Sequence, residues 1–490
     1  MILAHGNLYP DSELPRFLDT LAAECAGTIA AQSIDAQCVI AACDTLARRV
    51  RQGDYDAVLQ PFLQETGVSK GRFAEALALF QRESLEYKLK MELGQDAFPG
   101  PLRGKAPVEA VFSQEGQDAG PVSPCGEGSV STGSAPAEEN AGCAQLCAGA
   151  PISTGTAAAE QSVDAPAAQS TRPALLPRRR YPLGVLLHIA AGNVDGLPAY
   201  SVVEGLLAGN INLLKLPSAD RGASVLLLHE LVKIEPRLRD HVYVFDVPSS
   251  DPASLTALAE AADGVVVWGG DEAVRAARTL AQPNTKIIAW GHTLSFAYAA
   301  PDAPEEELRA LARHVCETRQ LLCSSCQGIF CDTADMDAVN ALAERFFALL
   351  QEENAHAAPA PASLRGRAAL QMLYEQMEAD AAGRRVLRAG GVGVVVAPDS
   401  RPELSPLAGN CWVKPLPRAN IVAQLKPLKG HLQTVGLLCA GADRGELGSL
   451  LARAGAVRIT PAGEMSRVLP GEAHDGTYAL REYTRVVEFF

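Results

Sequence analysis

Residues 182–218 read PLGVLLHIAAGNVDGLPAYSVVEGLLAGNINLLKLPS and predict the order strand, helix, strand. The run PLGVLLHIA fits a strand buried on both faces, the apolar segment around Leu197 to Leu207 fits a helix, and INLLKL fits a second strand. Two parallel strands need a crossover of this kind to connect them. The stretch is therefore typical of an open α/β sheet.

The same alternation continues toward the C-terminus. Three further strands are predicted in HVYVFDV, GVVVWG and TKIIAW, separated by the helical segments ASVLLLHELVKI, PASLTALAEAA and EAVRAARTLA. Short β-branched strands separated by helices predict a parallel, doubly wound sheet with right-handed crossovers. A second α/β region follows, with strands expected at Gly393–Ala397 and Leu432–Cys439.

A chain of 490 residues is too long for one compact core, so several domains are expected. Composition and periodicity divide it into a helical N-terminal region, a disordered insert rich in Ala, Gly, Ser and Pro, a cofactor-binding domain, a catalytic domain and a C-terminal segment. That last segment is expected to pack on the cofactor domain or to form an oligomer contact. The predicted bounds are 1–104, 105–177, 178–300, 301–440 and 441–490.

Charge and hydropathy restrict the partners. The formal net charge of −14 argues against nucleic acid and anionic membrane surfaces, because binding to phosphate requires a basic face. The first residues lack the basic and apolar regions of a secretory signal, and no stretch approaches about 18 uninterrupted apolar residues. We expect no membrane insertion and a cytoplasmic protein, whose twelve cysteines are then reduced thiols.

Four of these cysteines lie in CETRQLLCSSCQGIFC, residues 316–331. They indicate either a metal or iron–sulfur site or one catalytic thiol with three bystanders. The window lacks the paired CxxC knuckles of zinc sites. If Cys326 begins the strand that contains QGIFC, Cys331 should face the opposite side of the sheet. We predict no metal site, with a Cys-rich metal-binding scaffold as the alternative from another class of protein.

Candidate cofactor residues lie where strands end. The GxGxxG fingerprint is absent, but Gly269 and Gly270 end a strand and open a helix, where backbone N–H groups can approach a pyrophosphate. Asn193 follows the first strand and Lys215 ends the second. In an open parallel sheet, these carboxyl ends form the ligand-binding edge.

Residues 182–218, together with RQLLCSSCQGIF, LQTVGL, RITPAGEM and HDGTYALREYTR, resemble the aldehyde dehydrogenase superfamily. The pattern is closer to the long-chain acyl-CoA reductases, which include the reductase component of the bacterial luminescence fatty acid reductase complex. The resemblance spans about residues 180–490. It implies an aldehyde dehydrogenase-like α/β fold, with a doubly wound cofactor domain and an α/β catalytic domain, and a homo-oligomer.

The resemblance also implies roles for individual residues. Cys323 matches the nucleophile, and Asn193 matches the amide that forms an oxyanion hole with the backbone N–H of that cysteine. Lys215 matches the contact to the cofactor ribose. Ser218 stands where NAD-preferring relatives have an acidic residue, which favours NADPH over NADH, although Asp220 is close by in the sequence.

The implied activity is NADPH-dependent reduction of a fatty acyl-CoA or other acyl thioester to the aldehyde, through an S-acyl-cysteine. Ala289 stands where hydrolytic relatives have a Glu that activates water, which suits acyl transfer without hydrolysis. A short-chain CoA-acylating aldehyde dehydrogenase and a phosphate-ester reductase are alternatives, and an acyl-transferring protein is a candidate partner. Cys326 is either a disulfide partner for Cys323 or a small buried residue, and His474 is either functional or part of a loop.

Overall fold

The structure is a computed structural model, and it describes residues 1–31, 34–60, 77–94, 178–190, 196–217, 220, 222–467, 469 and 471–488. The predicted insert at 105–177 lies outside the described residues. So do Asn193 and Ser218, two of the predicted site residues.

The first sheet has seven strands in the order β2-β1-β6-β5-β4-β7-β8. Its five parallel strands wind outward from β4 in both directions, as the sequence predicted. They are β4 (Val185–Ile189), β5 (Ile211–Lys215), β6 (Val242–Phe245), β7 (Gly264–Trp268) and β8 (Lys286–Trp290). The connecting helices are α6 (Leu197–Leu207), α7 (Ala223–Ile234), α8 (Pro252–Glu260) and α9 (Asp271–Leu280), with the single turn η5 (Pro236–Leu238) before β6.

The N-terminal region begins with two short strands and not with a helix. β1 (Ile2–Ala4) and β2 (Asn7–Tyr9) form an antiparallel pair, and β1 continues the sheet beside β6. Strands of three residues are too short to show a clear alternation of polar and apolar residues, so no sequence pattern predicts them. Helices follow: η1 (Asp11–Glu13), α1 (Leu14–Ala31), α2 (Ala36–Gln52), η2 (Leu77–Phe80) and α5 (Arg82–Leu93).

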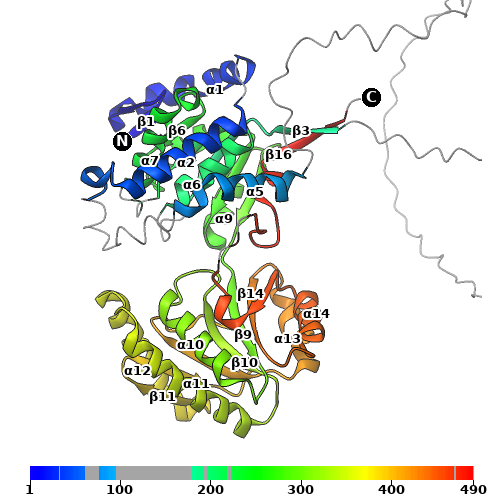
Figure 1. The fold of residues 1–490 in the computed structure, drawn as a ribbon. Coiled ribbons are helices and arrows are strands. Elements are labelled where there is room, and N and C mark those ends of the chain that lie inside the picture. Colours follow the sequence, from blue (N-terminus) through cyan, green and yellow to red (C-terminus); the bar gives the residue numbers. More distant parts are fainter. Residues whose placement is uncertain are drawn as a thin grey trace, which may run out of the picture. The chain divides into compact units, whose positions relative to one another are not determined.

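These N-terminal helices cover both faces of the first sheet (Figure 1). α2 and α5 share an apolar core with α6 and α7, while α1 and α8 share another core with the opposite face. Residues that alternate along each strand divide between the two cores: Leu186 points to the first and Leu187 to the second. Burial on both faces explains why these strands are almost uninterrupted apolar runs.

The second sheet also has seven strands, in the order β11-β12-β13-β10-β9-β14-β15. All neighbours are parallel except β11 and β12. The strands are β9 (Leu294–Ala299), β10 (Cys326–Cys331), β11 (Arg385–Ala389), β12 (Val392–Val396), β13 (Asn410–Pro415), β14 (Leu432–Leu438) and β15 (Arg458–Pro461). β9 and β15 lie beyond the predicted bounds of the catalytic domain, 301 and 440.

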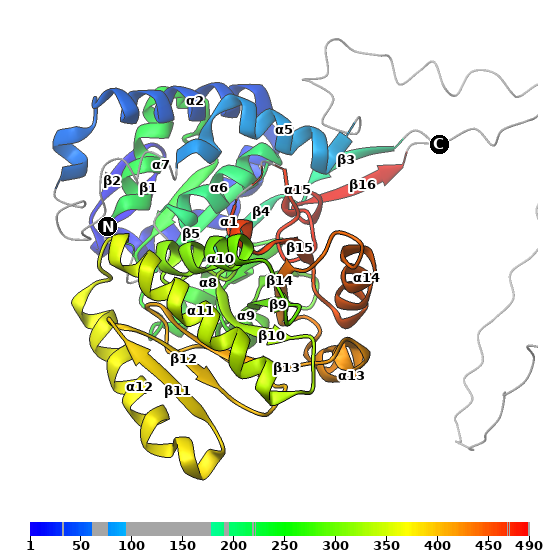
Figure 2. The same ribbon diagram turned by 60° about the horizontal axis from the view of Figure 1, so that its bottom comes forward.

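Helices cover this second sheet as well (Figure 2). α10 (Glu305–Thr318) and α11 (Met336–His356) pack on one face, and α13 (Ile421–Leu425) and α14 (Arg444–Ala454) pack on the other. α12 (Ala362–Ala382) lies beside β11 at the outer edge of this sheet. The single turns are η6 (Arg418–Asn420), η7 (Lys426–Leu428) and η8 (Ala462–Glu464).

Only the last part of the C-terminal segment packs on elements of the first half of the chain, because β15 belongs to the second sheet and α14 packs on that sheet. α15 (Ala479–Glu482) contacts α5 and α6, and β16 (Thr484–Glu488) pairs with β3 (Arg178–Pro182) in a separate antiparallel sheet. Glu92 of α5 accepts a hydrogen bond from the backbone N–H of Leu480 at 2.7 Å. Among the described residues, no helix is both long and apolar enough to cross a membrane.

Candidate active site

Cys323 lies in the turn that connects α10 to β10, and its side chain is exposed. Arg319 and Gln320, which directly follow α10, adopt left-handed conformations with φ of 51° and 62°. This abrupt end of the helix brings the chain back toward the sheet. Ser295 of β9 then donates a hydrogen bond from its hydroxyl to the carbonyl of Cys323 at 2.7 Å, which holds the peptide in place.

Among the described residues, the Cys323 thiol has one side-chain hydrogen-bond partner, Gln433 of β14. The Nε2 amide of Gln433 donates to Cys323 Sγ at 3.2 Å and to Asp475 Oδ1 at 2.7 Å. Gln433 is only 6% exposed, and its Oε1 atom is buried without a hydrogen-bond partner in the part of the chain that the structure describes. Gln433 and Asp475 were not among the predicted site residues, although both lie in stretches that carry the resemblance, LQTVGL and HDGTYALREYTR.

The surroundings of Cys323 have opposing effects on the pKa of its thiol. Desolvation is the main effect and raises the pKa of the thiol above its usual range, because protein atoms surround the sulfur closely even though the side chain reaches solvent. The hydrogen bond from Gln433 lowers this pKa, whereas the Asp475 carboxylate raises it. Cys323 is therefore a neutral thiol at rest, with an amide donor already placed to stabilise the thiolate.

Two glutamines fix the turn from its other side. Gln327 Oε1 accepts hydrogen bonds from the backbone N–H and the hydroxyl of Ser405, at 3.1 and 2.8 Å. Gln320 Oε1 accepts from the backbone N–H of Gly409 at 3.0 Å. Both glutamines connect the chain around Cys323 to the loop that precedes β13. The turn that carries Cys323 is therefore held on both of its sides by side-chain hydrogen bonds.

The other three cysteines of the window lie in one apolar core. Cys316, Cys326 and Cys331 belong to the same buried cluster, so the prediction that Cys326 and Cys331 face opposite sides of the sheet was wrong. The reason is a register shift in β10 between Cys326 and Ile329, which breaks the alternation of side chains. Burial raises the pKa of Cys316 to about 11 and those of Cys326 and Cys331 to about 12.

This packing gives no support to the metal-site alternative. Metals bind the thiolate form of cysteine, and these thiols are neutral and surrounded by apolar side chains. No group of three or more His, Cys, Asp or Glu side chains among the described residues could hold a metal ion. Cys326 donates from Sγ to the carbonyl of Gly328 and has no exposed surface, so it is a buried core residue.

Lys215 lies at the carboxyl end of β5, as predicted, and is 7% exposed. Its Nζ donates to Ser249 Oγ at 3.3 Å, and burial lowers its pKa while the Asp246 carboxylate opposes that shift. Asp220, which was close to Ser218 in the sequence, accepts hydrogen bonds from the backbone N–H and hydroxyl of Ser224 in the first turn of α7. Its carboxylate therefore has a structural role there.

The Gly269–Gly270 pair lies at the predicted junction of strand and helix. Gly269 donates its N–H to the carbonyl of Trp290 at 3.1 Å, and Gly270 precedes the first residue of α9. The first turn of α9 carries Asp271 and Glu272. Two carboxylates at a helix N-terminus repel an anion, so this end of α9 is a weaker pyrophosphate site than the glycines alone suggested.

An aromatic cluster lies at the carboxyl ends of β7 and β8. The ring of His474 contacts Trp268 and Trp290, with centroids 4.9 and 5.1 Å apart. Because Asp475 follows His474 in the chain and bonds Gln433, a continuous set of contacts runs from Cys323 to this cluster. His314 is buried in α10.

Residues 174–486 match the acyl-CoA reductase (LuxC) family. The chain belongs to this family. Similar curated proteins include the long-chain acyl-protein thioester reductases of Photorhabdus luminescens, at 26% identity over 64% of this chain and 64% of the relative, and Aliivibrio fischeri, at 24% identity over 62% of this chain and 64% of the relative. The chain thus matches slightly less than two thirds of the length of these relatives.

Among solved structures, the fold of this LuxC-family chain resembles aldehyde dehydrogenases. Aldehyde dehydrogenase 21 from Physcomitrella patens aligns over 98% of this chain and 90% of its own, with a TM-score of 0.63 and 12% identity. A betaine aldehyde dehydrogenase variant from Staphylococcus aureus aligns over 64% of this chain and 68% of its own, with a TM-score of 0.50 and 12% identity. The aldehyde dehydrogenase-like fold predicted from the sequence is confirmed.

Proposed function

We propose that this chain reduces a fatty acyl thioester to the aldehyde, with Cys323 as the residue that carries the acyl group. The observation that supports this most directly is the hydrogen bond from Gln433 Nε2 to the exposed Cys323 Sγ. The eight other described cysteines are buried, so within the described part of the chain Cys323 is the thiol that a substrate in solvent can reach.

In the first step, the Cys323 thiolate attacks the carbonyl carbon of the acyl thioester. The carbon–sulfur bond of the donor then breaks, and the donor leaves as a thiolate. The donor amide of Asn193 and the backbone N–H of Cys323 are the proposed oxyanion-hole groups. Because the attacking and leaving sulfurs are similar in basicity, the acyl group is exchanged without a strong general acid.

The second step needs a hydride donor, and NADPH is the proposed cofactor. When bound, it supplies hydride to the acyl carbon. Lys215 fits the ribose or a phosphate of this cofactor, because its ammonium lies at the carboxyl edge of a doubly wound sheet, where such ligands bind. The hydrogen bond from this ammonium goes to the neutral hydroxyl of Ser249, which leaves its positive charge available for the cofactor. Ser218 in place of a carboxylate favours the 2′-phosphate of NADPH over NADH.

After reduction, the bond between carbon and Cys323 Sγ breaks and the aldehyde leaves. Gln433 is placed to stabilise the sulfur as it regains negative charge. Ala289, at the end of β8, offers no carboxylate to activate water, which protects the acyl-cysteine from hydrolysis.

The acyl donor is proposed to be a fatty acyl-CoA or a protein that carries an acyl thioester. The second choice is supported by the names of the relatives from Photorhabdus luminescens and Aliivibrio fischeri, which are described as acyl-protein thioester reductases. An acyl-transferring partner protein and a homo-oligomer are part of this proposal. A short-chain CoA-acylating aldehyde dehydrogenase is the second candidate within the fold.

The test begins without cofactor. Incubation with a long-chain acyl-CoA should add one acyl group to the wild-type chain, measured by intact mass, and Cys323→Ala should add none. Cys439→Ala, which removes a buried cysteine, is the matched control and should still be acylated. Acylation of the Cys323→Ala variant at the wild-type rate would overturn the assignment. A series of acyl-CoA chain lengths with NADPH and with NADH then separates the two candidate activities.

A further inference from the structure

Helix α12 has an apolar stripe on its solvent side in addition to its buried face. Its buried residues are Leu364, Ala368, Met372 and Ala379. On the opposite side are four large exposed apolar residues at helical spacing, Leu370, Leu373, Tyr374 and Met377, which are 55%, 46%, 53% and 73% exposed. Single exposed apolar residues are ordinary, but a continuous stripe of four marks a surface that binds another protein.

Charge along α12 is divided between its two halves. Arg365 and Arg367 lie in the N-terminal half, and Glu375, Glu378 and Asp380 lie in the C-terminal half. At 100° per residue, Arg367 and Glu378 lie on the same flank of the apolar stripe, near its two ends. When two copies of such a helix pack antiparallel, the basic half of each lies against the acidic half of the other.

We propose that the apolar stripe of α12 binds the same stripe of a second copy of this chain, in an antiparallel pair with two-fold symmetry. A two-fold interface is self-complementary, and α12 meets that requirement in both its apolar residues and its charges. Arg367 of one copy lies opposite Glu378 of the other, and the symmetry repeats this contact. A different partner would have to supply its own matching charges, whereas the second copy already has them.

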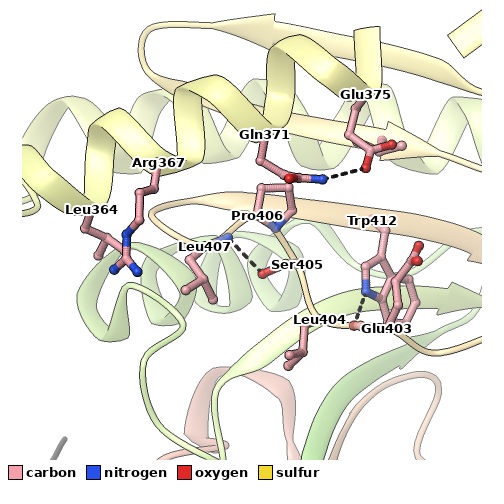
Figure 3. A pocket seen from close by; sticks show the side chains of 11 residues that line it. Leu364, Arg367, Gln371, Glu375, Glu403, Leu404, Ser405, Pro406, Leu407 and Trp412 are labelled. Atoms are coloured by element: carbon pink, nitrogen blue, oxygen red, sulfur yellow. Dashed lines mark hydrogen bonds between the residues drawn. The ribbon is translucent and has the colours of Figure 1, made fainter. Parts of the chain in front are cut away.

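The face extends beyond the helix. Figure 3 shows Arg367, Gln371 and Glu375 projecting from α12 toward the loop that carries Leu404 and Leu407. Together they line a cavity of about 330 Å³ along the flank of the stripe. Leu404 is 58% exposed at this cavity. A stable dimer buries roughly 1,200–2,000 Å² in total, and a helix of 21 residues, about 30 Å long, together with this loop offers a face of suitable length.

The first measurement is the mass of the full chain in solution by sedimentation or light scattering across micromolar concentrations. The variant with Tyr374→Lys and Met377→Lys should give particles of half the wild-type mass, because each lysine would bury an unpaired charge in the apolar interface. Ile29→Lys in α1, which changes an apolar residue that is 53% exposed, is the matched control and should keep the wild-type mass. Equal masses for the wild type and the double variant would overturn the proposal.

A charge exchange tests the antiparallel arrangement itself. Arg367→Glu places two carboxylates opposite each other at both symmetric contacts and should weaken association roughly tenfold. Adding Glu378→Arg to the same chain restores opposite charges and should restore the affinity. Failure of the second change to rescue the first would contradict the pairing.

The main competing occupant is the acyl-donor protein. If the lysine variant keeps its wild-type mass and reduces acyl-CoA normally but loses reduction of an acyl-protein, the stripe binds the donor and the self-association proposal is wrong. Association is measured without substrate, so its result does not depend on the proposed reaction.

Discussion

Gln433 connects the Cys323 thiol to the Asp475 carboxylate through a single amide nitrogen, 3.2 Å from Sγ and 2.7 Å from Oδ1. The bond to Asp475 orients the amide, so its other hydrogen points at the sulfur. Ser295, which holds the carbonyl of Cys323, also accepts a hydrogen bond from the backbone N–H of Thr434, the neighbour of Gln433. β9 and β14 thus position both the backbone and the side chain of the nucleophile.

Gln433→Leu should slow acylation of Cys323 at neutral pH by roughly 10- to 100-fold, because a hydrogen bond to a charged group contributes roughly 1.5–3 kcal/mol. The pKa of Cys323 is lowered by this donor, so its loss should move the rate–pH profile to higher pH. Rapid-quench acylation across pH measures both effects. An unchanged profile would leave Gln433 with a purely structural role.

Asp475→Asn should move the same profile in the opposite direction. The Asp475 carboxylate raises the pKa of Cys323, and an amide of the same shape removes that charge. Thiolate formation then begins at lower pH, and acylation at neutral pH should become faster. A shift to higher pH would instead mean that orientation of Gln433 matters more than the charge of Asp475.

The sequence predicted the parts of this protein that depend on local periodicity. The five parallel strands from Val185 to Trp290 are long enough to show apolar runs, and Lys215 could be placed at a strand end from its position alone. Gln433 could not be found in the same way, because its role comes from β14 lying beside β9, and that neighbour relation is not encoded by spacing. The register shift in β10 likewise has no signal in the sequence. For this reason the face of the sheet on which Cys331 lies was predicted wrongly.

Cys323 should be the first cysteine to react with iodoacetamide. Eight other described cysteines are buried, and burial raises the pKa of the core thiols Cys316, Cys326 and Cys331. To remove the three cysteines outside the described residues from the experiment, Cys125, Cys143 and Cys147 are first changed to Ser. Peptide mapping should then show one rapidly labelled residue, and prior acylation should protect it. Rapid labelling of Cys326 would contradict its buried position.

Lys88 should be important for stability. Its ammonium forms ion pairs with Glu92 and with Glu204, the latter at 2.8 Å, and all three side chains are at most 8% exposed. Lys88→Met leaves two buried carboxylates without a cation and should lower the free energy of unfolding by about 3–5 kcal/mol. Lys233→Met, which breaks an exposed pair with Glu230 at 2.8 Å, should cost less than about 1 kcal/mol. Denaturant titration compares the two variants, and equal losses would contradict the buried network.

His314 should make stability depend on pH. It is 4% exposed in α10, its Nε2 has no hydrogen-bond partner among the described residues, and burial lowers its pKa from 6.5 to about 4. Between these two values the unfolded chain binds a proton that the folded chain does not. The contribution of neutral His314 to the free energy of unfolding is therefore complete above about pH 6.5 and is lost as the pH falls toward 4.

His314→Leu should reduce the wild-type loss of stability across this range by up to about 3 kcal/mol, measured by denaturant titration at each pH. His356→Leu, in the last turn of α11, is the matched control for the loss of an imidazole. An equal slope in the wild type and the His314→Leu variant would show that this imidazole binds its proton equally in both states.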